Sequence, residues 1–140
     1  MPRLTPNWQP LSRLPTLAEM VSTQLAEVKT QLQNLRAAQK QPHVLDDYTV
    51  ERVIKVYREQ QDYLWVCEAQ LARWQKDHLS AAQRRQTAQI AQQLKQLKPE
   101  ISEVLAIALD LKDKTIESIL EKSDPEVALE VLSGKIAPPY

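Results

Sequence analysis

The chain has 140 residues, of which 43% are hydrophobic, a length and composition that suit one folded domain with one core. Its 18 Lys and Arg residues balance 18 Asp and Glu residues, so there is no global charge to attract nucleic acid or anionic lipid. One glycine and no phenylalanine disfavour a β-protein, because tight strand connections need glycine. The sequence therefore predicts an all-α fold.

The first expected element is an extended, proline-rich arm over residues 1–15. Its four prolines remove backbone donors and bias the preceding residues away from helix. The arm also carries Trp8, Leu11 and Leu14, so we expect it to lie across the helices. Thr16 and Glu19 have the spacing of a capping box, which predicts a first helix from there to about Lys40.

Two further long helices follow from apolar residues that recur at spacings of three and four. The second is expected to run to His78, with either Asp46 or Asp47 as its N-cap. Ser80 and Gln83 form a second predicted capping box, so the chain turns sharply there and a third helical leg begins.

The third leg is expected over residues 81–122, with a kink or break at Pro99 that makes it effectively two helices. A short C-terminal helix is expected at 125–134, followed by a tail at 135–140. Short connections favour antiparallel neighbours. The predicted fold is thus an antiparallel bundle of three long helices within one domain over residues 16–134.

Catalytic and metal sites are not indicated by any motif. Cys67 and His78 lie about three helical turns apart, roughly 16 Å along the axis, which is too far for both to bind one ion. The position of Cys67 on the apolar stripe argues against a reactive thiolate. Neither a nucleophile elbow nor a glycine-rich phosphate loop occurs. We therefore expect no enzyme activity, no cofactor and no metal.

A cluster of basic residues surrounds the turn between the second and third helices. A basic corner beside a tryptophan could bind a phosphate backbone, and the alternative is a solvated helix junction. The candidate nucleic-acid patch comprises Arg73, Trp74, Lys76, Arg84 and Arg85.

A partner-protein surface is the function class that the sequence favours. Ile54, Trp65 and Val66 lie away from the main stripe of the second helix and give it a second apolar face. Alternatively, Trp8 of the arm covers Trp65. We expect a soluble, cytoplasmic interaction or scaffolding module that binds a partner protein or forms a homodimer, because no signal or membrane-spanning segment is apparent.

Overall fold

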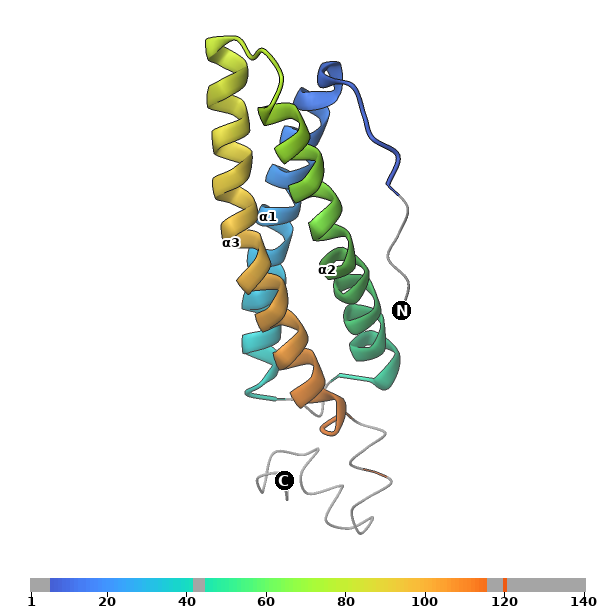
Figure 1. Ribbon diagram of the computed structural model, residues 1–140. Helices are drawn as coiled ribbons and strands as arrows, with labels where there is room; N and C mark the ends of the chain where they lie inside the picture. Colours follow the sequence, from blue (N-terminus) through green and yellow to red (C-terminus); the bar gives the residue numbers. More distant parts are fainter. Residues whose placement is uncertain (1–5, 42–44, 116–119, 121–140) are drawn as a thin grey trace. The chain divides into compact units, whose positions relative to one another are not determined.

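The computed structural model describes residues 6–41, 45–115 and 120 of the chain. These residues form one short 3-10 helix, three long α-helices and no strand: η1 (Leu11–Arg13), α1 (Leu14–Ala38), α2 (Asp47–Gln75) and α3 (Ala81–Lys112) (Figure 1). The predicted all-α fold class is confirmed. None of these helices combines the length and the hydropathy that crossing a bilayer requires.

The described residues fall into two compact units, and each unit contains a segment of α1, α2 and α3. The first unit comprises the described residues of Met1–Thr30 and Glu59–Ser102. The second comprises the described residues of Gln31–Arg58 and Glu103–Tyr140.

The core of the first unit consists largely of the side chains that the three-and-four spacing placed on one stripe of each helix. Its apolar members from these stripes are Val21, Leu25, Val28, Leu64, Cys67, Leu71, Trp74, Leu94, Leu97 and Ile101. On α3 the first turns differ from the expectation, because Thr87 and Ile90 are buried while Ala88 is exposed. The larger side chain of Ile90 removes more apolar surface from water, which favours its burial over that of Ala88.

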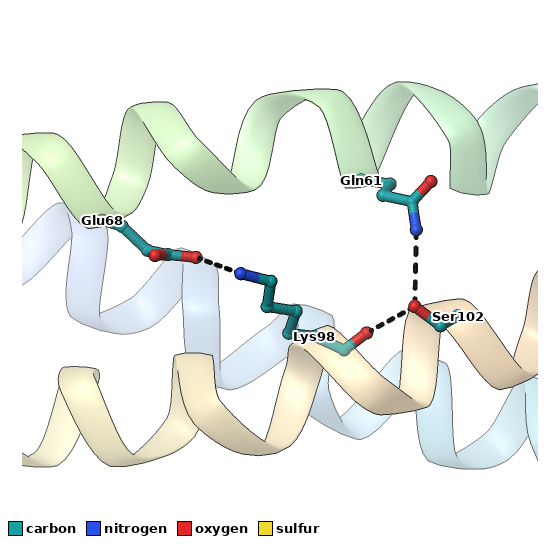
Figure 2. A network of polar contacts seen from close by, with 4 residues as sticks. All are labelled: Gln61, Glu68, Lys98 and Ser102. Atoms are coloured by element: carbon teal, nitrogen blue, oxygen red, sulfur yellow. Dashed lines mark hydrogen bonds and ion pairs between the residues drawn. The ribbon is translucent and has the colours of Figure 1, made fainter.

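Two polar contacts fix the direction of α2 against α3 within the first unit (Figure 2). The Glu68 carboxylate lies 3.7 Å from the Lys98 ammonium, and Gln61 Nε2 donates to Ser102 Oγ at 3.4 Å. Because the residue later in α2 pairs with the residue earlier in α3, the two helices run antiparallel here, as predicted. Both partners of the ion pair are largely exposed, so the pair contributes at most about 1 kcal/mol.

The second unit has its own core, to which all three helices contribute. Its buried apolar residues are Leu32, Leu35, Val50, Ile54, Tyr57, Val104, Leu105, Ile107, Ala108 and Leu111. Thr115, just beyond the end of α3, is also buried, and its hydroxyl donates to the carboxylate of Asp47 at the start of α2. Arg36 and Glu103 form an ion pair between α1 and α3.

The predicted N-caps of α2 and α3 are confirmed. Asp46 Oδ1 accepts a hydrogen bond from the Thr49 backbone N–H at 2.8 Å. Hydrogen bonding with the side chain of Thr49, and to a smaller extent with its backbone, lowers the pKa of the Asp46 carboxyl. Ser80 Oγ accepts from the Gln83 backbone N–H at 3.1 Å, while Gln83 Oε1 accepts from the Ser80 backbone N–H at 2.9 Å. Each bond satisfies a donor that the helix itself leaves unpaired.

We expect Ser80→Ala to lower the free energy of unfolding by about 1 kcal/mol, because it removes the acceptor of the α3 N-cap. Ser80→Asp is the matched control, since aspartate retains that acceptor and places a negative charge at the positive end of the helix dipole. Urea unfolding followed by circular dichroism measures both. Equal losses for the two variants would contradict the capping role.

The predicted start of α1 is wrong by two residues. Thr16 lies inside α1, which already begins at Leu14, and η1 leads directly into it. Pro15 therefore occupies the first turn of the helix, where the missing backbone N–H costs nothing and the fixed φ angle fits. A hydroxyl inside the helix is no N-cap, so Thr16 and Glu19 do not form the expected capping box.

The predicted break at Pro99 is also wrong, because α3 continues through Pro99 as one helix from Ala81 to Lys112. Pro99 has no backbone N–H, so the carbonyl of Lys95 loses its helical hydrogen bond. Both residues are exposed, so water can bind to that carbonyl instead. α3 ends at Lys112, ten residues earlier than the expected Lys122. The predicted C-terminal helix at 125–134 and the tail lie outside the described residues.

Candidate functional site

The basic patch predicted around the turn between α2 and α3 is only partly exposed. Its four cations are on the surface: Arg73, Lys76, Arg84 and Arg85. Trp74, in contrast, is 3% exposed, and its indole Nε1 donates to the backbone oxygen of Gln9 at 3.1 Å. Because the ring is packed in the core, Trp74 is not part of the basic surface. The hydrogen bond from the indole instead holds the arm against α2.

Another tryptophan, Trp8 of the arm, lies beside the cations. The Cζ atom of Arg73 is 4.6 Å from the centroid of the Trp8 ring, a cation–π geometry. Trp8 remains 38% exposed. Burial of Trp65 under Trp8 stays a prediction.

The candidate partner surface does not form an exposed patch. Ile54 is 7% and Val66 is 8% exposed, and only Trp65 is half-buried. The two aliphatic side chains lie in different units, Ile54 in the second and Val66 in the first. The helix therefore has buried apolar side chains away from its main stripe in both units.

Cys67 and His78 belong to no group of metal ligands within the described part of the chain. No group of three or more His, Cys, Asp or Glu side chains in residues 6–41 and 45–115 could hold a metal ion. Burial, with a smaller effect from the charge of Glu68, raises the pKa of the Cys67 thiol to about 11. The thiol is thus protonated near neutral pH and is not an activated nucleophile.

A pocket of about 570 Å³ opens in the first unit between the arm, α1 and α2. We call it the arm pocket. Its lining residues are Pro6, Asn7, Gln9, Arg13, Thr16, Leu17, Met20, Tyr63, Val66, Cys67, Gln70 and Trp74. This volume lies within the range of small-molecule and side-chain binding sites, which are mostly apolar with a few placed polar groups.

Hydrogen bonds to α2 hold the arm in the position that forms one wall of this pocket. The backbone N–H of Gln9 donates to Gln70 Oε1 at 2.6 Å, and the Gln9 carbonyl accepts from Trp74 Nε1 at 3.1 Å. Both backbone groups of Gln9 are satisfied in this way by buried side chains of α2. The expected packing of the arm on the helices is thus observed for its described residues.

The edge of the arm pocket carries two large apolar side chains that are in contact with water. Tyr63 of α2 is 45% exposed, and Met20 of α1 is 36% exposed. Both line the pocket, as does Val66, the one member of the predicted partner surface that reaches it. An aromatic and a thioether side chain beside an apolar hollow are typical of surfaces that bind proteins.

Most residues of the arm pocket could not be found from the sequence. The three-and-four spacing identified Cys67 and Trp74 as buried but gave no indication that they line a pocket. No signal in the sequence marked Gln70, because its buried amide oxygen accepts from the backbone N–H of Gln9, which is 61 positions away. Comparisons with known protein families, with curated proteins and with solved structures found no match for this chain.

Proposed function

We propose that the protein is a non-enzymatic helical interaction module that binds a partner protein through the arm pocket. The observation that carries the proposal is an open, largely apolar pocket of about 570 Å³ with Tyr63 and Met20 half-exposed at its edge. A pocket of this kind can receive an apolar side chain of a partner, while the exposed edge residues are covered by the surrounding contact.

The chemistry of the lining supports binding rather than catalysis. Cys67 is the only nucleophilic thiol in the chain, and its raised pKa keeps it in the unreactive form. The lining residues that the structure describes include no histidine, aspartate or glutamate that could act as a general base.

The test uses the double variant Met20→Ala plus Tyr63→Ala in the full chain. The wild-type protein is used to capture partners from a lysate of its source, and the purified partner is then titrated by calorimetry. We expect the double variant to bind about tenfold or more weakly, because residues at such an edge contribute 1 kcal/mol or more each when they are hot spots. Tyr48→Ala is the control, since Tyr48 is 71% exposed and lies in the second unit.

Equal affinity of wild-type and double variant would overturn the assignment of the pocket. The same proposal includes self-association, in which the partner that binds the arm pocket is a second copy of this chain. In that case the mass measured by analytical ultracentrifugation rises with concentration for the wild type, and the double variant stays monomeric.

A second candidate function, nucleic-acid binding, is favoured by the start of α3. Arg84 and Arg85 lie in its first two turns, close to the positive end of the helix dipole, where cations are unfavourable, and Lys76 is nearby in the chain. Such a placement suits an anionic partner. Salt-sensitive binding of a DNA or RNA duplex that Arg84→Gln plus Arg85→Gln abolishes would favour this function over the first.

We further propose a reducing cytoplasmic location, since the single cysteine has no cysteine partner. A helix over residues 125–134 and a kink at Pro99 also stay proposals.

A further inference from the structure

The arm pocket contains a hydrogen-bond donor whose orientation is fixed by the arm. Gln70 is 7% exposed, and its Oε1 must be the acceptor side of the amide because it receives the backbone N–H of Gln9. The Nε2 group is therefore left as a donor. No side chain or carbonyl in the described part of the chain accepts a hydrogen bond from it, while the residue lines the pocket.

Arg13 is the only charged residue among the described residues of the lining. It has no ion-pair partner in residues 6–41 and 45–115, and the lining contains no acidic residue. The polar part of the pocket thus includes one guanidinium and one unpaired amide donor, beside Asn7, Gln9 and Thr16. The remaining wall includes apolar groups such as Leu17, Met20 and Val66.

We infer that the arm pocket binds an apolar side chain with a carboxylate beside it, presented by an acidic segment of a partner protein. The inference rests on the proposed function and names the chemistry of its partner. A guanidinium and an amide donor can each donate a hydrogen bond to a carboxylate oxygen, and charge-assisted hydrogen bonds are the strong ones. The apolar wall receives the neighbouring aliphatic or aromatic group.

The open edge of the pocket favours a protein segment over a free small molecule. Tyr63 and Met20 line the pocket yet stay 45% and 36% exposed, so a ligand that fills only the hollow leaves them in water. Small-molecule sites usually bury most of the ligand surface. A segment of a larger partner can cover these side chains as well as fill the hollow.

The experiment uses three synthetic peptides that share a central pair of leucines and differ only in the flanking residues, which are glutamate, glutamine or lysine. Each is titrated into the full chain labelled with ¹⁵N, and the side-chain amide signals of Gln70 report occupancy of the pocket. We expect the glutamate peptide to bind about tenfold or more tightly than the glutamine peptide, and the lysine peptide to bind most weakly.

Two variants test the donors separately. Arg13→Gln should remove most of the preference for glutamate over glutamine. Gln70→Glu has nearly the same shape and keeps an acceptor for the backbone N–H of Gln9, but it replaces the free donor by an acceptor; it should reverse the preference toward the lysine peptide. Arg52→Gln is the control, because Arg52 is an exposed arginine of the second unit. If Gln70→Glu fails to fold, Arg13→Gln alone tests the preference for the glutamate peptide.

The outcomes separate this inference from the proposed function. Equal binding of all three peptides at Gln70, weakened by Met20→Ala plus Tyr63→Ala, would overturn the carboxylate preference and leave the partner site standing. Peptides that leave the Gln70 signals unchanged would overturn both. Tighter binding of free 4-methylpentanoate than of the glutamate peptide would assign the pocket to a small molecule and overturn the protein partner.

Discussion

Replacing Leu97 by alanine is expected to lower the free energy of unfolding by about 2–5 kcal/mol. Leu97 of α3 has an exposed fraction of 0% in the core of the first unit. The truncation removes buried methyl and methylene groups and leaves a cavity that the surrounding side chains fill only partly. Chemical unfolding followed by circular dichroism gives the free energy.

Leu109→Ala is the matched control for this prediction, because it makes the same substitution on the same helix at a residue that is 44% exposed. We expect it to cost less than about 1 kcal/mol, since much of the side chain is already in water. Similar losses for the two variants would contradict the burial pattern of α3.

Replacing Pro99 by alanine is expected to raise the free energy of unfolding by about 2 kcal/mol. Proline in a helix interior costs roughly 3 kcal/mol relative to alanine. The substitution also makes the unfolded chain more flexible, which stabilises the unfolded state and offsets about 1 kcal/mol of the increase. Pro99 is exposed inside α3, so its ring contributes little to the core. The alanine restores a backbone N–H for the carbonyl of Lys95.

The same unfolding measurement checks the Pro99 prediction, with Gln96→Ala as the control at an exposed position of α3. That substitution should change the stability by no more than about 0.5 kcal/mol. A loss of stability in Pro99→Ala would contradict the prediction and would show that the proline ring, or a bend that it causes, is needed for packing.

The class of the fold and the starts of two helices follow from local patterns. The spacing of three and four places leucines and valines on one stripe, and a helix with such a stripe is stable only when the stripe is buried. The N-caps Asp46 and Ser80 are equally local, because each side chain bonds to a backbone N–H three residues later. These features depend on neighbours along the chain, so the sequence is sufficient to predict them.

The predicted capping box at Thr16 and the predicted break at Pro99 failed for a related reason. A capping pair and a proline each favour a helix boundary by about 1–3 kcal/mol, whereas burial of several side chains on either side favours a continuous helix by more. In α1 the buried Leu14 precedes the expected cap. In α3 the buried Leu97 and Ile101 lie on both sides of the proline.

By itself, the sequence determined that the chain forms amphipathic helices and which stripe of each is apolar. Only the tertiary structure decided that the second apolar face of α2 is largely buried, since Ile54 in the second unit and Val66 in the first are both buried. It also decided where the arm lies. The arm pocket depends on the bonds that Gln9 makes with residues of α2 more than 60 positions away, and no periodicity within one helix encodes such contacts.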